Sequence, residues 1–164
     1  MRYVEIKKND VANGPGVRVS LWVAGCSHHC EGCFNESTWD FCSGKEFTDT
    51  QIEEIKNLLK NSPVKKNFSI LGGDPLEFIN HNMLEKLLKE LKCDFPNLNI
   101  WIWTGYKWED IKHLQLLKYI DVLVDGEFIL SQKNLKLKFR GSSNQRVIDV
   151  QKSLNEGKII TVDI

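Results

Sequence analysis

Three cysteines gather in one short run of the chain: Cys26, Cys30 and Cys33 are separated by three residues and then by two. Thiolates at this spacing can each bind one iron of a [4Fe-4S] cluster. Because no fourth cysteine lies nearby, the fourth iron would keep an open position for a ligand that carries amine and carboxylate groups. The run therefore predicts a cluster held by three cysteines and able to bind a small molecule.

A zinc site is the alternative use of the same residues. His28 or His29 would complete it, since zinc commonly takes four nitrogen or sulfur ligands. Both histidines lie inside the short loop, where reaching the same metal as the flanking thiolates is sterically awkward, and no second ligand pair has zinc-like spacing. These facts favour the iron–sulfur cluster. The two other cysteines, Cys42 and Cys93, lie far apart and are predicted to be non-ligands.

Polar or glycine-rich residues also follow several predicted strands. Gly72, Gly73 and Asp74 come after an apolar run, and Thr104 and Asp125 end two further runs. Paired glycines let backbone carbonyls approach a ligand closely, and the Asp74 carboxylate can pair with an ammonium group. Ligands bind at the carboxyl ends of parallel strands, so we expect these segments to meet the cysteine loop at one mouth.

The elements that must position these residues follow from apolar periodicity. Alternation predicts a strand at 17–23, and short apolar runs predict three more, at 68–71, 100–104 and 121–125. Thr48 and Gln51 form a possible capping box for a helix that ends at 61–63. Asn80 is expected to cap a second helix, and a third is predicted over 108–117. The segments 147–151 and 158–162 could form a terminal hairpin, with a helix as the alternative for 147–151.

Alternating strands and helices predict an α/β fold with a parallel sheet. A complete barrel of eight strand–helix units needs about 250 residues, and this chain has 164. We therefore expect an incomplete βα barrel whose active site lies at the carboxyl ends of the strands. Its open side would suit a substrate that is itself a protein segment.

Length and composition set the remaining limits. The chain, residues 1–164, suits one domain, with 41% hydrophobic residues for a core. Lys plus Arg equals Asp plus Glu, at 22 each, so no net charge favours nucleic acid or an anionic membrane as partner. The absence of a signal-like or membrane-spanning apolar run predicts a cytoplasmic protein. Five cysteines without a secretory signal make a disulfide framework improbable.

The cysteine spacing resembles the cluster motif of radical S-adenosylmethionine (SAM) enzymes. Further segments occur in the order typical of anaerobic ribonucleoside-triphosphate reductase-activating proteins, and the resemblance runs from about Asn13 to Ile148. Those segments are Asn13–Arg18, Ser37–Trp39, Gly72–Leu76, Trp103–Tyr106, Val122–Gly126 and Arg140–Gln145.

The resemblance implies a radical SAM fold and a definite reaction. One electron from the reduced cluster would cleave SAM into methionine and a 5′-deoxyadenosyl radical. That radical would take a hydrogen atom from a glycine of the large anaerobic ribonucleoside-triphosphate reductase subunit. A strong donor such as reduced flavodoxin is implied as the electron source. Cys26, Cys30 and Cys33 would then be both the metal ligands and the catalytic centre.

The resemblance also assigns cofactor contacts. Gly72, Gly73 and Asp74 match the segment that contacts the amino group of SAM. Many radical SAM enzymes have an aromatic residue that packs on adenine at the place of Gly32. Because this residue is glycine here, adenine contacts are expected from the backbone around Gly32 and from Phe34.

Two strand ends and one late loop complete the assignments. Thr104 and Asp125 match positions near the SAM carboxylate or a monovalent cation, although a strand-end cap and a turn explain them equally well. The segment Arg140–Gln145 reads as a polar, flexible, basic loop, and the resemblance suggests that it docks the reductase.

Two rival functions remain open at this point. A radical SAM enzyme for a small molecule would share the SAM features but need a more enclosed pocket. A noncatalytic iron–sulfur or zinc module would bind no SAM and release no 5′-deoxyadenosine.

Overall fold

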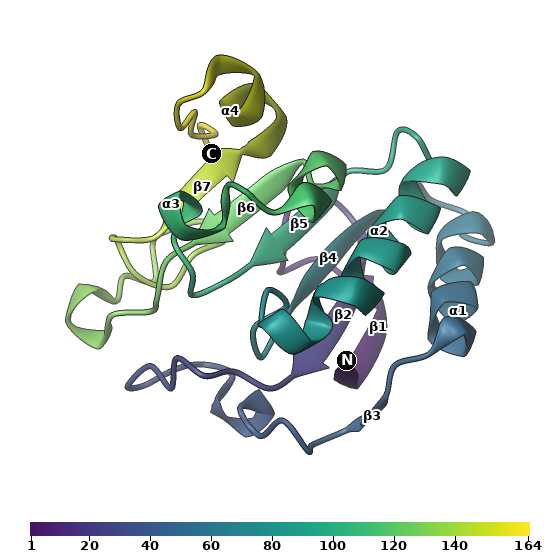
Figure 1. Cartoon of the computed structure of the whole chain (residues 1–164), viewed down its shortest axis with the longest axis horizontal. Helices are drawn as coiled ribbons and strands as arrows, with labels where there is room; N and C mark the ends of the chain where they lie inside the picture. The colour runs from purple at the N-terminus through teal and green to yellow at the C-terminus, as the bar shows by residue number, and fades with distance from the viewer.

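A seven-stranded mixed sheet forms the centre of the computed structural model, which describes residues 1–164 (Figure 1). The strand order is β3-β1-β2-β4-β5-β6-β7. The four central strands β2, β4, β5 and β6 are parallel, whereas β1, β3 and β7 pair antiparallel with their neighbours. The strands are β1 (Arg2–Asp10), β2 (Arg18–Ala24), β3 (Lys45–Glu46), β4 (Asn67–Gly72), β5 (Ile100–Trp103), β6 (Val122–Asp125) and β7 (Arg146–Asp149).

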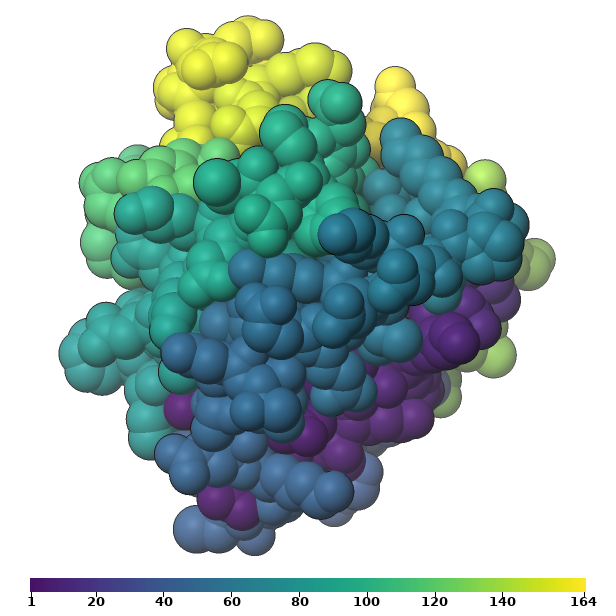
Figure 2. Space-filling view, turned by 90° about the vertical axis from the view of Figure 1, so that its right-hand side faces the viewer, coloured from purple at the N-terminus to yellow at the C-terminus, as the bar shows by residue number.

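Helices cover one face of this sheet. They are α1 (Asp49–Lys60), α2 (His81–Asp94), α3 (Trp108–Ile111) and α4 (Val150–Glu156), with short 3-10 turns at Glu36–Thr38, Phe78–Asn80, Gln115–Tyr119 and Leu130–Gln132. From the right-hand side of Figure 1, the blue and teal residues of α1 and α2 form a layer beside the purple N-terminal residues (Figure 2). No helix is long and apolar enough to cross a membrane.

The two faces of the sheet have different roles because side chains alternate along a strand. Val19, Leu21 and Val23 of β2 are fully buried in the main core, which also contains Ile52 and Ile55 of α1. Burial of such side chains contributes about 1.5–3 kcal/mol each. The residues between them, such as Trp22, face the other side of the sheet, and Trp22 lines a cavity there. The helical face therefore holds the main core, whereas the opposite face carries a smaller apolar cluster and the cavity.

Most predicted elements are confirmed. The predicted strands correspond to β2, β4, β5 and β6, and their parallel pairing is confirmed. The capping box is present at the start of α1, where the Thr48 N–H donates to Gln51 Oε1 at 2.9 Å. Asn80 precedes α2, but its side chain makes no cap; it donates instead to the Asp74 carbonyl at 3.1 Å.

Three expectations need correction. The sheet is parallel only at its centre, because β1, β3 and β7 join it antiparallel. The helix predicted over 108–117 is broken into α3 and a 3-10 turn at Gln115–Tyr119. The terminal hairpin is wrong: β7 pairs with β6, α4 follows it, and only an isolated bridge joins Ile148 to Thr161. Val150 is fully buried on α4, so packing favours the helix over a turn.

Candidate active site

A cavity of about 740 Å³ occupies the uncovered face and the carboxyl ends of the central strands. Cys26, Cys30 and Cys33 all line it, together with Gly72–Asp74 and Thr104. Its floor includes Trp22, Leu71 and Trp103, one from each of three neighbouring strands. Its volume lies in the range of small-molecule and cofactor sites. The structure therefore brings together segments that lie far apart in the sequence.

Backbone hydrogen bonds anchor the start of the cysteine loop to the segment that follows it, and one further bond involves a cysteine sulfur. The Gly25 N–H donates to the Thr38 carbonyl at 2.8 Å, and the Cys26 N–H donates to the Trp39 carbonyl at 3.0 Å. Near the other end, the Asn35 N–H donates to Cys33 Sγ at 3.3 Å. Gly25 has φ +96°, a conformation that favours glycine. The loop thus leaves β2 through a turn that directs the cysteines over the strand ends.

Asp74 is a buried carboxylate that links the loops after β4 and β5. It accepts hydrogen bonds from the Leu76 N–H at 2.8 Å and from the Gly105 N–H at 2.8 Å. The Thr104 hydroxyl donates to its two oxygens at 2.8 and 2.9 Å. The protein itself therefore satisfies this carboxylate, and Asp74 fixes the position of Thr104 and Gly105 at the cavity wall.

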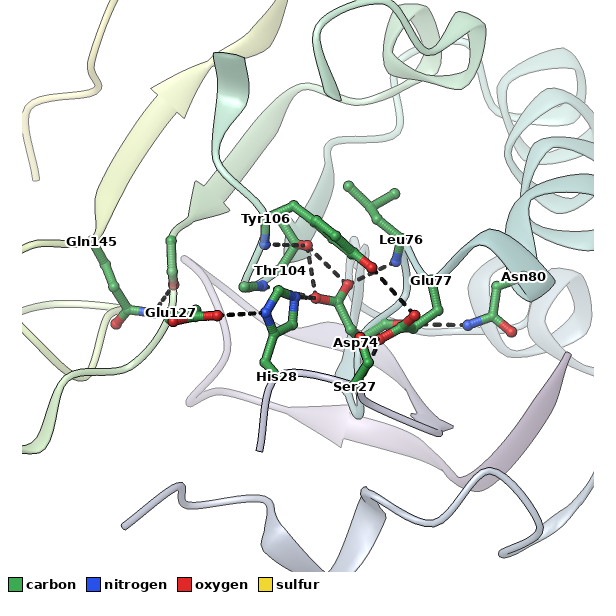
Figure 3. Close-up of polar contacts among 12 residues, drawn as sticks. Ser27, His28, Asp74, Leu76, Glu77, Asn80, Thr104, Tyr106, Glu127 and Gln145 are labelled. Carbon is green, nitrogen blue, oxygen red and sulfur yellow. Dashed lines mark hydrogen bonds and ion pairs between the residues drawn. The ribbon is translucent and has the colours of Figure 1, made fainter. Parts of the chain in front are cut away.

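His28 lies between two carboxylates (Figure 3). Its Nε2 is 3.1 Å from Asp74 Oδ2, and its Nδ1 is 2.8 Å from Glu127 Oε1. Asp74 first, and then Glu127, raise the pKa of His28 to about 9 against the opposing effect of burial, so the ring is an imidazolium at neutral pH. Both nitrogens face carboxylates rather than the cysteines, which removes His28 as the fourth zinc ligand.

His29 does not line the cavity; its ring packs against Trp39 at a centroid distance of 4.8 Å. No three His, Cys, Asp or Glu side chains lie close enough to hold a single metal ion. A [4Fe-4S] cluster has no such requirement, because its thiolates bind different irons. The donor set and the shared cavity therefore suit a cluster.

Glu77 ties the start of the cysteine loop to the segment after β4. Its Oε1 accepts from both the N–H and the hydroxyl of Ser27 at 2.6 Å, and its Oε2 accepts from the Tyr106 hydroxyl at 3.3 Å. The sequence analysis considered His28 only as a possible zinc ligand and did not single out Glu77. The available signal was their position, each within three residues of a predicted site residue.

Gly73 allows the second loop to approach the first. A Cβ at this position would lie 2.3 Å from the Gly25 carbonyl oxygen. The Gly73 N–H donates to the Val23 carbonyl at 2.8 Å, and the Asp74 N–H donates to the Gly25 carbonyl at 2.7 Å. Close backbone packing therefore requires glycine here.

Two cysteines have thiols whose pKa lies above the ordinary value. Burial raises the pKa of Cys26 to about 11, and the negative charges of Asp74 and Glu77 add to this effect. Burial also raises the pKa of Cys30, with a contribution from Glu127. Metal ligation requires the thiolate, so iron binding at these residues must release protons.

Phe34 and Gly32, the predicted adenine contacts, differ in position. Phe34 lines the cavity, is 61% exposed and packs edge-on against Phe128 at 5.4 Å. Gly32 does not line the cavity, and a Cβ there would lie 2.9 Å from Leu130 Cδ1.

Asp125 and Thr104, the predicted strand-end contacts, also separate. Thr104 lines the cavity, whereas Asp125 does not. The Asp125 carboxylate is buried and accepts from the Trp108 N–H at 2.7 Å and from the Arg146 guanidinium. This pairing raises the pKa of Arg146. In this structure Asp125 therefore serves the fold.

The loop 140–145 is folded upon itself. Gln145 Oε1 accepts from the Gly141 N–H at 2.8 Å and the Ser142 N–H at 3.1 Å, and its Nε2 donates to the Gly126 carbonyl at 2.9 Å. Arg140 Nη1 donates to the Gln145 carbonyl at 2.6 Å. Hydrogen bonds of the Gln145 side-chain amide therefore link this polar loop to Gly126, directly after β6.

Comparisons with known proteins agree with this site. Residues 12–148 match the family model described as a 4Fe-4S single cluster domain. The chain is 46% identical over 149 residues to the anaerobic ribonucleoside-triphosphate reductase-activating protein of Enterobacteria phage T4, covering 90% of this chain and 93% of the relative. Identically named proteins of Haemophilus influenzae and Escherichia coli K12 are each 41% identical, over 88% and 90% of this chain and 96% and 97% of their own lengths. The chain therefore belongs to the family of anaerobic ribonucleoside-triphosphate reductase-activating proteins.

Proposed function

We propose that this protein activates an anaerobic ribonucleoside-triphosphate reductase by radical SAM chemistry. The observation that carries the proposal is the single cavity shared by three cysteines and the Gly72–Asp74 segment. Cys26, Cys30 and Cys33 would hold a cluster that, once reduced by an external donor, would supply one electron to split SAM into methionine and a 5′-deoxyadenosyl radical. That radical would take a hydrogen atom from the α-carbon of a reductase glycine. The chain's own part is to bind, orient and shield these reactants.

Cys26, Cys30 and Cys33 would hold the cluster, leaving one iron for SAM. Cys42 and Cys93 are exposed and do not line the cavity. This arrangement supports ligation by three cysteines of the chain and no more.

Gly73 is our choice for the main contact to the SAM amino group. It lines the cavity, and its carbonyl accepts no hydrogen bond within the chain. An ammonium group is a donor that needs such acceptors. Asp74, whose oxygens are already occupied, would act as a positioning residue for Thr104, and Gly72 would allow the tight approach of the loop to β2.

Other residues supply the remaining surroundings. Trp22 Nε1 is buried on the cavity floor without a partner in the chain, which makes it a donor for a bound molecule. The exposed Phe34 ring at the cavity is our candidate for packing on adenine. We assign Gly32 and Asp125 supporting roles in the loop and at the strand end.

The wider assignments follow from the same proposal. The sheet has free edges at β3 and β7, and we propose that it corresponds to the incomplete βα barrel of a single radical SAM domain. The open cavity suits a protein segment as substrate. Reduced flavodoxin or a similar donor would deliver the electron, and the reaction would occur in the cytoplasm.

The test is anaerobic reconstitution with iron and sulfide, followed by SAM, dithionite and the reductase. The proposal expects 5′-deoxyadenosine and a glycyl-radical doublet in the electron paramagnetic resonance spectrum of the reductase. SAM cleavage without a doublet would favour the small-molecule enzyme. Absence of SAM binding and cleavage would favour the noncatalytic module.

A further inference from the structure

A basic segment forms one rim of the cavity. Residues 128–140, which we call the basic strap, follow β6 and include four cavity-lining apolar side chains. The strap contains three lysines and one arginine but no acidic residue, although the whole chain has equal numbers of both charges. In Figure 1 the green strap and the dark blue cysteine loop project from the same end of the sheet. The strap therefore concentrates positive charge beside the predicted reaction site.

The lysines of the strap form no ion pair within the chain. Lys133, Lys136 and Lys138 are exposed, and none lies within ion-pair distance of a carboxylate. Lys133 does not line the cavity, but its Nζ lies 4.8 Å from the centre of the ring of Phe34, which does. Arg140 differs, since it donates to a backbone carbonyl of its own loop. Three unpaired charges thus remain available at the rim.

Apolar side chains are exposed among these charges. Leu135 is 81% exposed and Phe34 61%, and both line the cavity. Exposed apolar groups that cluster beside polar ones are typical of interaction sites. An aliphatic side chain at the centre of the strap favours a protein over a nucleic acid, which is bound through aromatic stacking and phosphate contacts.

The strap is held in place rather than loosely attached. The Asn134 N–H donates to the Gly141 carbonyl at 3.1 Å, and Trp103 Nε1 donates to the Phe139 carbonyl at 2.7 Å. These bonds attach the strap to the loop 140–145 and to β5. The strap therefore presents its lysines and Leu135 on a preformed surface, which lowers the entropic cost of binding.

We propose that the basic strap binds a segment of the reductase that contains both acidic and apolar residues. This segment would lie next to the glycine that receives the radical. This inference rests on the proposed function and names the surface and the partner chemistry that it uses. The target glycine must enter the cavity to meet the radical, and the strap borders that entrance. An electron donor has no such need, because an electron can reach a cluster through intervening protein.

The test uses the full chain, reconstituted with its cluster, and the intact reductase. In the strap variant, Lys133→Glu, Lys136→Glu and Lys138→Glu are combined. The control variant combines Lys60→Glu, Lys65→Glu and Lys89→Glu, three exposed lysines that do not line the cavity. The dissociation constant for the reductase is measured by anaerobic calorimetry at low and high ionic strength.

We expect the strap variant to bind the reductase about tenfold or more weakly at low salt, with the difference shrinking as salt screens the charges. The control variant should bind like the wild type, and both should release 5′-deoxyadenosine with dithionite at the wild-type rate. Leu135→Ser should weaken binding at low and high salt alike.

Three results would overturn the inference. The strap variant could bind as tightly as the wild type, or the control variant could lose as much affinity. The defect could also be confined to reactions driven by flavodoxin and vanish with dithionite, which would assign the surface to the electron donor. If the wild type itself forms no glycyl radical, the proposed function fails instead, so the two failures are distinguishable.

Discussion

Asp74→Asn tests whether the buried carboxylate positions the cofactor site. Asparagine keeps one acceptor oxygen and replaces the other with an NH₂ group. That group would face either the Gly105 N–H or the Leu76 N–H, now 2.8 Å from an oxygen. A buried donor left without an acceptor costs about 1–3 kcal/mol, and His28 also loses one of its two carboxylates. We expect the free energy of unfolding to fall by about 2–5 kcal/mol.

Asp125→Asn is the matched control. Asp125 is also 1% exposed, also accepts a backbone N–H and also pairs with a cation, Arg146. It does not line the cavity. Both variants should therefore be destabilised by similar amounts, but only Asp74→Asn should weaken SAM binding, because Thr104 and Gly105 lose their fixed positions.

The assay combines urea unfolding at neutral pH with anaerobic calorimetry of SAM binding to the reconstituted variants. We expect the SAM dissociation constant to rise about tenfold for Asp74→Asn, equivalent to about 1.4 kcal/mol. Wild-type SAM affinity in Asp74→Asn would refute the positioning role. An equal loss in Asp125→Asn would show that general destabilisation explains the effect.

Three further changes test separate parts of the account. Gly73→Ala places a Cβ 2.3 Å from the Gly25 carbonyl oxygen. We expect the free energy of unfolding to fall by about 1–3 kcal/mol. Elemental analysis should also find less iron in the variant after reconstitution. Trp22→Phe removes a donor that has no partner in the chain; calorimetry should show SAM bound about fivefold more weakly, equivalent to one hydrogen bond, with an unchanged urea midpoint. The double variant Cys42→Ser, Cys93→Ser should keep wild-type iron and sulfide content, and a loss of either would contradict ligation by three cysteines.

The central strands and the convergence of the site could be predicted because local patterns determine them. Alternating apolar residues identify β2, and the Thr48–Gln51 capping box marks the first turn of α1. Four parallel strands necessarily end at the same edge of a sheet. The meeting of the cysteine loop with Gly72–Asp74 followed from that geometry.

The antiparallel strands β1 and β7 were not predicted because their own residues carry a weak strand pattern, and they are stabilised by pairing with β2 and β6. β1 is rich in charged residues and only partly buried, and it is recognisable as a strand only beside β2. β7 was read as part of a hairpin, since the sequence does not reveal that β6 supplies its partner.

The interior contacts of the site were equally inaccessible from the sequence. His28 meets Asp74 and Glu127 across 46 and 99 positions of the chain. Only the fold shows that Asp125 is occupied by Arg146 while the nearby Thr104 lines the cavity. Long-range pairing therefore decides which strand-end residues line the cavity.

The central claim is that three cysteines hold a cluster with one iron open to SAM. The most direct measurement is the electron paramagnetic resonance spectrum of the anaerobically reconstituted, dithionite-reduced protein, recorded before and after SAM is added. The account predicts a [4Fe-4S]⁺ signal that changes when SAM binds and that disappears when Cys26, Cys30 or Cys33 is replaced by alanine. A cluster signal that SAM leaves unchanged, or stoichiometric zinc without acid-labile sulfide, would contradict it.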